Sequence, residues 1–336
     1  MGESAIFAHV ASRGGRKLPE ISFTSTNDDP FIQSLTCARQ IVIESIKNGA
    51  PVVQTYSDLQ AAMVDIEADA ETIVTIRGYV KELLFTEYND DPDIDDWEGC
   101  FDIDTLDVSN NKNLKKLSIA LNENIEELDL AANTQLQTLD CNSCTGLTSL
   151  DLAANTQLQT LDCGDIPNLT SLDLAANTQL QTLYCNSCTG LTSLDLAANT
   201  QLQTLYCNSC TGLTSLDLAA NTQLQTLDCE DIPNLTSLDL AANTQLQNLY
   251  CNSCTGLTSL DLAANTQLQT LDCNSCTGLT SISYPATNSN VSTAIASAIT
   301  VATATDGTVY TDSAGAYYST IETAATTKGW TIEQIA

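Results

Sequence analysis

The chain has 336 residues, of which 11 are Lys or Arg and 42 are Asp or Glu, so its formal net charge is −31. This anionic excess argues against binding to the phosphates of DNA or RNA and against docking on anionic lipid. No apolar run reaches the roughly 18 residues that a membrane-spanning helix needs, so we expect no membrane insertion. No Lys or Arg occurs between Lys116 and Lys328. We therefore expect neutral or cationic partners, or partners bridged by divalent ions.

Residues 1–30 are predicted to form an extended N-terminal arm, because they are small, polar and interrupted by glycines. The arm carries a basic cluster of Arg13, Arg16 and Lys17, which we interpret as an anchor to other subunits of a larger assembly. No apolar segment follows the charged start, so we predict no signal peptide and expect synthesis in a cytoplasm without export.

Residues 31–100 are predicted to form an α/β anchoring segment. We expect helices around 31–47 and 57–70, a strand over 72–85 and an acidic loop over 86–100.

The acidic loop contains carboxylates at alternate positions, a spacing that resembles a calcium loop. They are Asp91, Asp93 and Asp95, followed by Asp102. Residues 92 and 96 depart from the calcium pattern, because the turn of such a loop needs glycine. Calcium binding by this loop is left open.

Residues 103–284 are internally repetitive. Seven 22-residue units run from Ile125 to Gly278, preceded by a degenerate unit over Ile103–Asn124. Each unit has two 11-residue halves with the template L-x-x-L-x-L/C-x-x-N/C-x-x. A short fixed period predicts a solenoid, and its apolar alternation predicts one inward-facing strand in each half, hence two parallel sheets. Position 9 of the first half is always Asn, which predicts a buried Asn ladder that binds turn backbone groups.

This template resembles the leucine-rich repeat. The nested 11+11 form, with Cys in place of Leu in one half, resembles the bacterial subclass called IRREKO and the cysteine-ladder repeats of internalin-like proteins. The resemblance covers about residues 103–284 and implies a right-handed, mainly β solenoid. Its members are mostly adhesion or protein-recognition modules, so the resemblance implies binding and not catalysis.

Five units contain a C-x-x-C pair, which on its own suggests zinc or redox chemistry. The repeat favours a different interpretation. The first Cys stands where the other half has Leu, and the second stands where two units have Ile166 and Ile232. A position that accepts Ile belongs to an apolar core, so we predict a ladder of buried free thiols. Disulfides and a metal site are the alternatives.

Position 5 of each half faces outward. In the first half it is Asp in every unit, which predicts a hydrophilic face on which salt or cations such as Ca²⁺ offset repulsion. In the second half it varies, and we predict that this row is the ligand-binding face. The row consists of Asp140, Asp162, Tyr184, Tyr206, Asp228, Tyr250 and Asp272. Surface drift between copied units is the alternative, and an outward threonine row keeps ice binding as a weaker one.

Residues 285–336 break the pattern and are predicted to form an α/β C-terminal cap. We expect helices near 291–300 and 317–327, and strands near 308–311 and 330–335. Such a cap covers the apolar rungs and unpaired strand edges at an open solenoid end.

These features predict a non-catalytic binding or attachment protein that recognises a protein or glycan receptor. His9 is the single histidine, and no nucleophile–base constellation is evident, so we expect no enzyme, no cofactor and no metal. Without an export signal, we favour a virion component such as a phage appendage or receptor-binding protein. The alternatives are a cytoplasmic protein-recognition scaffold and a structural decoration protein without a ligand.

Overall fold

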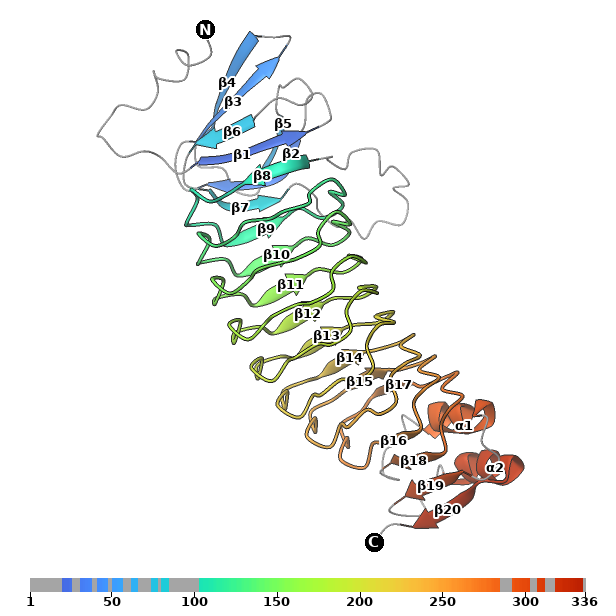
Figure 1. The fold of residues 1–336 in the computed structure, drawn as a ribbon. Helices are drawn as coiled ribbons and strands as arrows, with labels where there is room; N and C mark the ends of the chain where they lie inside the picture. The colour runs from blue at the N-terminus through green and yellow to red at the C-terminus, as the bar shows by residue number, and fades with distance from the viewer. Residues whose placement is uncertain are drawn as a thin grey trace.

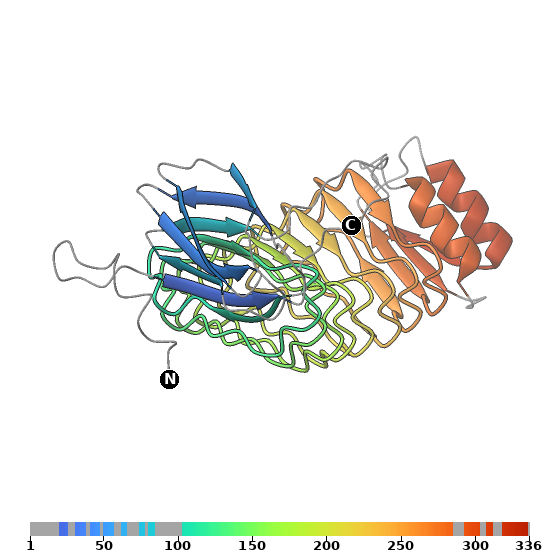
Figure 2. The same cartoon turned by 90° about the horizontal axis from the view of Figure 1, so that it is seen from above.

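The computed structural model describes residues 20–25, 31–37, 41–47, 50–56, 62–65, 74–77, 80–84, 103–284, 292–302, 307–311 and 318–334. These residues form an elongated solenoid with N-terminal strands at one end and two helices at the other (Figure 1, Figure 2). No helix among them is long and apolar enough to cross a membrane.

The second half of each repeat contributes one three-residue strand to a continuous parallel sheet. These strands are β9 (Lys116–Ser118), β10 (Thr138–Asp140), β11 (Thr160–Asp162), β12 (Thr182–Tyr184), β13 (Thr204–Tyr206), β14 (Thr226–Asp228), β15 (Asn248–Tyr250) and β17 (Thr270–Asp272). Neighbours pair in register, so Leu139 lies beside Leu161 and Asp140 beside Asp162. The central Leu of each strand points inward, because successive side chains of a strand alternate between its two faces.

The first halves of the repeats behave differently from the expected second sheet. Only β8 (Ile103–Asp107), β16 (Ser259–Asp261) and β18 (Ser281–Tyr284) are strands there. Between successive coils on this side lie shallow grooves of about 400 and 380 Å³, lined by Asp151 and neighbouring Ala and Ser residues. Among the described residues, the predicted parallel first-half sheet is present only at the C-terminal end, where β16 pairs with β18, whereas β8 pairs antiparallel with β1.

The core is a stack of leucine, cysteine and asparagine ladders. The expected Asn ladder is confirmed: Asn221 is fully buried, and its Nδ2 donates to the backbone carbonyls of Leu196 and Asn199 at 3.0 and 2.9 Å. The same pattern recurs from Asn133 to Asn265. The same carbonyls also accept backbone N–H groups of their own turns, so each Asn adds a second donor and ties its coil to the preceding one.

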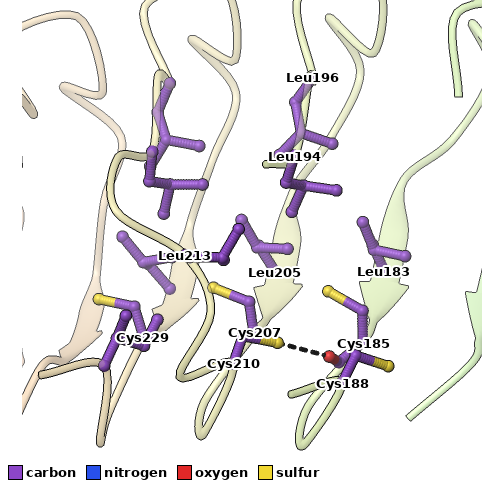
Figure 3. Close-up of a cluster of buried hydrophobic side chains, with 14 of the residues drawn as sticks. Leu183, Cys185, Cys188, Leu194, Leu196, Leu205, Cys207, Cys210, Leu213 and Cys229 are labelled. Carbon is purple, nitrogen blue, oxygen red and sulfur yellow. Dashed lines mark hydrogen bonds between the residues drawn. The ribbon is translucent and has the colours of Figure 1, made fainter. Parts of the chain in front are cut away.

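The cysteines of the repeats are free and buried, as the substitution pattern predicts. Figure 3 shows Cys185, Cys188, Cys207 and Cys210 packed among leucines of successive coils. Burial raises the pKa of the Cys144 thiol to about 12, so this thiol stays protonated at neutral pH. The cysteine ladder is thus an apolar wall of the core.

Two backbone features close each coil. Residues at position 8 of the second half have a left-handed φ between 53° and 65°, although none is glycine. They are Leu121, Ser143, Asp165, Ser187, Ser209, Asp231, Ser253 and Ser275. Three residues later the chain approaches the preceding coil, and a Cβ on Gly146 would lie 2.6 Å from the carbonyl oxygen of Glu123.

The described residues of the N-terminal segment form strands and not the predicted helices. Its strands are β1 (Glu20–Ser25), β2 (Phe31–Cys37), β3 (Ile41–Lys47), β4 (Ala50–Tyr56), β5 (Ala62–Asp65), β6 (Val74–Arg77) and β7 (Val80–Leu84). The helix predicted around 31–47 is wrong, because its β-branched residues lie in β2 and β3. The described part of 57–70 is strand β5, and β1 lies inside the predicted arm. β-Branched residues pack well on a pleated surface when partner strands are present.

These strands extend both sides of the first coils. β7 pairs in parallel with β9 and so adds a rung to the solenoid sheet, while β2 and β5 continue it. On the other side β8 is the edge of a five-stranded sheet in the order β4-β3-β6-β1-β8. The N-terminal strands therefore cover the end of the leucine core.

The C-terminal elements agree with the predicted order of helix, strand, helix and strand. They are α1 (Ser292–Val301), β19 (Thr308–Thr311), α2 (Tyr318–Lys328) and β20 (Thr331–Gln334). β19 and β20 continue the parallel pairing of β16 and β18. Buried Ile295, Ile299 and Ile321 join the same core as the repeats.

Candidate binding face

The outward side chains of the continuous sheet form the surface on which the predicted ligand-binding residues meet. We call the position 5 row of β9–β15 and β17, with positions 7 and 8 of the adjoining turn, the sheet face. All seven predicted residues lie on it as neighbours in register, because each strand pairs with the equivalent strand of the next coil. They are partly buried.

Two tyrosines stack at the middle of the sheet face. The rings of Tyr184 and Tyr206 have centroids 5.0 Å apart with an angle of 25° between their planes. Such an offset stack is worth about 0.5–1.5 kcal/mol beyond its buried area. Because both rings rise from adjacent rungs of a hydrogen-bonded sheet, they form a rigid aromatic patch.

Carboxylates flank this patch on both sides. Burial, together with the nearby charge of Asp140, raises the pKa of Asp162 to about 6. Burial also raises the pKa values of Asp228 and Glu230, and the charge of Asp228 contributes to the shift of Glu230. The sheet face therefore holds carboxylates whose charge is poorly solvated.

Burial also raises the pKa of Asp140, at the N-terminal end of the row. A hydrogen bond from Ser118 Oγ at 2.6 Å, the backbone N–H of Asn142 and the charge of Lys116 offset part of this rise. No Lys or Arg occurs between Lys116 and Lys328, so the remaining carboxylates of the row have no such cation in the repeats.

Each Asp at position 5 of the second half also accepts a hydrogen bond that stabilises its own turn. Oδ1 of Asp162 accepts a hydrogen bond from the backbone N–H of Gly164, two residues later, at 3.1 Å. Asp140, Asp228 and Asp272 accept the equivalent bond. This is an Asx turn, in which the side chain replaces a backbone acceptor. A tyrosine at the same position cannot make this bond.

The first-half Asp ladder makes the same turn on the opposite side of the coil. Oδ1 of Asp151 accepts from the N–H of Ala153 at 3.0 Å, and Asp107 through Asp261 repeat the pattern. The sequence predicted only a hydrophilic face here. The aspartates are retained in every coil for a local reason that requires no cation.

Positions 7 and 8 add polar groups that the predicted row did not include. Asn142 Nδ2 donates to both Asp162 and Asp165 at 3.4 Å, and Asn186 Nδ2 donates to Asp165 at 3.2 Å. The sequence signal was present, because these positions vary between otherwise copied units. Their place in the site depends on the left-handed turn, which turns them beside the strand.

Other predicted sites fall outside the part of the chain that the structure describes. They are the basic cluster of Arg13, Arg16 and Lys17, the loop with Asp91, Asp93 and Asp95, and His9. Within the described residues, no three His, Cys, Asp or Glu side chains converge as metal ligands.

No protein-family model matches the chain, and no curated protein matches it. Among solved structures it is similar to the functional domain of InlJ from Listeria monocytogenes, which includes a cysteine ladder. The two are 31% identical with a TM-score of 0.41, over 61% of this chain and 51% of that chain. An internalin, InlF, from the same species is 18% identical with a TM-score of 0.39, over 68% of this chain and 69% of that chain. The chain thus spans about half the length of the first of these structures.

The 22-residue period, the leucine and asparagine ladders and the one-sided parallel sheet together make residues 103–284 a leucine-rich-repeat solenoid with a cysteine ladder.

Proposed function

We propose that the chain is a non-catalytic binding protein whose sheet face recognises the surface of a protein or glycan receptor. The observation that carries the proposal is the stacked pair of Tyr184 and Tyr206 on a rigid, outward-facing sheet. Rigid aromatic rings with a polar tip supply much of the energy at recognition surfaces.

The tyrosines replace a residue that would serve the fold better. Asp at this position closes an Asx turn in the neighbouring coils, a hydrogen bond worth about 0.5–1.5 kcal/mol. Tyr250 gives up that bond without gaining a stacked ring, because its strand neighbours carry Asp228 and Asp272. A local rule broken in copied units without a gain in stability supports a functional role over drift.

The grooves lie between coils on the side opposite the continuous sheet, away from the tyrosines. Attachment to a virion or other assembly through residues 1–30 stays a prediction, as do the scaffold and decoration alternatives.

The test is a binding screen of the labelled chain on an array of purified extracellular proteins and glycans. We expect Tyr184→Ala with Tyr206→Ala to weaken binding to the array ligand at least tenfold, while the melting temperature falls by only a few degrees. The matched control is Asp173→Asn with Asp195→Asn, which changes two first-half positions and keeps their Asx turns. A screen without a ligand, or a ligand bound equally well by the tyrosine variant, would contradict the proposal and favour a structural role.

A further inference from the structure

The sheet face contains the same arrangement twice. Asp162 and Asp165 precede Tyr184, and 66 residues later Asp228 and Asp231 precede Tyr250. The Ile-Pro-Asn turn at 166–168 recurs at 232–234, so the Asp and Tyr positions of two coils recur three coils later, although Gly164 corresponds to Glu230 and Tyr206 to Asp272. Each copy places its position 5 carboxylate directly beside its tyrosine, because Asp162 pairs in register with Tyr184 and Asp228 with Tyr250.

The distance between the two copies follows from the sheet. Neighbouring strands of a sheet lie about 4.8 Å apart, so three coils separate equivalent atoms by roughly 14 Å. The Tyr184–Tyr206 stack begins in the first copy and reaches the second, because Tyr206 pairs in register with Asp228. The face is thus a row of carboxylate, two rings, carboxylate and ring.

The chemistry of each copy fits a planar cation. An Arg guanidinium binds a carboxylate through two N–H donors and stacks on an aromatic face, and the Asp–Tyr pair offers both partners side by side. At Asp140, the charge of Lys116 offsets part of the rise in pKa that burial causes. Asp162 and Asp228 have no such cation in the repeats. Their raised pKa values show that an external cation would relieve a poorly solvated charge.

We propose that the sheet face binds an extended arginine-bearing peptide segment, with one guanidinium at Asp162 and Tyr184 and a second at Asp228 and Tyr250. The inference rests on the proposed binding function and names the partner's chemistry. In an extended segment the two arginines stand four residues apart, because four residues span roughly 13 Å. A metal ion fits less well, since no three ligand groups converge in the described part of the chain.

The probe is the fluorescein-labelled peptide Arg-Gly-Ser-Gly-Arg, titrated with the full chain at low salt and followed by anisotropy. We expect it to bind at least tenfold more tightly than a peptide with one arginine, because the second contact is intramolecular. Replacing both arginines by citrulline, which is neutral and similar in shape, should abolish binding. The two-lysine peptide should bind several-fold more weakly, because an ammonium lacks the bidentate, stacking plane.

Asp162→Asn with Asp228→Asn should weaken binding of the two-arginine peptide at least tenfold. Asn keeps the Oδ1 acceptor that closes the Asx turn, so the fold is retained. The matched control, Asp151→Asn with Asp217→Asn, removes equal charge from the first-half side of the same two coils and should change affinity less than twofold. Tyr184→Leu with Tyr250→Leu should weaken binding several-fold.

An equal loss of affinity in the sheet-face pair and in the control pair of Asn variants would show general attraction to an acidic surface. It would overturn the two-site proposal. So would unchanged binding by the citrulline peptide, or displacement of the peptide by millimolar CaCl₂ but not by NaCl of equal ionic strength. In a further outcome, the chain fails to bind the two-arginine peptide while Tyr184→Ala with Tyr206→Ala still weakens binding to an array ligand. That result would overturn this inference and leave the proposed function intact.

Discussion

The thiol of Cys210 donates a hydrogen bond to the backbone carbonyl of Cys185, 25 residues earlier, at 2.9 Å. Asn221 in the first half of the next repeat reaches back by the same 25 residues to the carbonyl of Leu196. The second Cys of each C-x-x-C pair therefore occupies the ladder position of Asn and makes one of its bonds. In the two units with Ile166 and Ile232 that bond is replaced by apolar contact alone.

This correspondence predicts an order of stability. Cys210→Ala loses one weak bond and a small apolar volume, so we expect its unfolding free energy to fall by about 1–2 kcal/mol. Asn221→Ala loses both hydrogen bonds that tie its coil to the carbonyls of Leu196 and Asn199, which keep only their turn N–H donors, and it leaves a small void, so we expect a fall of about 2–4 kcal/mol. Urea unfolding followed by circular dichroism measures both. Equal losses would mean that the two ladders are not equivalent.

The buried thiols are expected to resist alkylation in the folded chain. Cys144, with its pKa raised to about 12 by burial, is almost entirely protonated at pH 8, and only the thiolate reacts. Iodoacetamide should label the repeat cysteines only after denaturation, as counted by peptide mass spectrometry. Rapid native labelling at Cys144, or a mass loss that reports sulfur–sulfur bonds between coils, would contradict the core assignment.

Stability should rise as the pH falls from 7.5 towards 4, in part through Asp162. Its pKa is about 6 in the folded chain against 3.8 as the ordinary value, so the folded state binds the proton more tightly between these values. Asp162→Asn removes this penalty while keeping the Asx acceptor. We expect the variant to be more stable by about 1–3 kcal/mol at pH 7.5, and equal to the parent near pH 4. Thermal melts at both pH values measure the difference, and a gain that persists at pH 4 would exclude titration of Asp162 as its cause.

The left-handed position 8 predicts an unusual order of substitutions at Leu121, whose φ is 65°. Alanine there keeps the Cβ penalty, whereas glycine adopts this region without it. We expect Leu121→Gly to be more stable than Leu121→Ala by about 1 kcal/mol, although glycine normally destabilises a chain relative to alanine. Paired urea titrations test the order. An alanine variant as stable as the glycine variant would show that the turn relaxes to another conformation.

The repeat region could be predicted well because its signals are local. Leu at positions 1, 4 and 6 fixes which side chains point inward, and Ile166 and Ile232 showed that the cysteines share that environment. The C-terminal elements were also predicted, since their helices and strands are short and separated by clear turns. The helix expected around 31–47 failed, because β3 takes its conformation from strands on both sides, β4 and β6.

The candidate site likewise has one part that the sequence predicts and another that it does not. The row that contains Tyr184 and Tyr206 could be found from the sequence, because variation among copied units marks an outward position. The sequence alone could not predict the ring stack, the Asx turns, or the position of Asp165 and Asn186 beside the row. Each depends on the spacing of coils or on a left-handed turn, which are properties of packed neighbours.

The sequence by itself determined the coil, because a fixed period sets the direction of every side chain relative to its own backbone. Only the tertiary structure decided which half of the coil closes into a continuous sheet and which opens into grooves. It also decided that Asp162 lies in a poorly solvated row while Asp151 caps a turn on the exposed side. The physical reason is that spacing and solvation belong to the stack of coils, and one repeat contains no information on how closely the next will lie on each side.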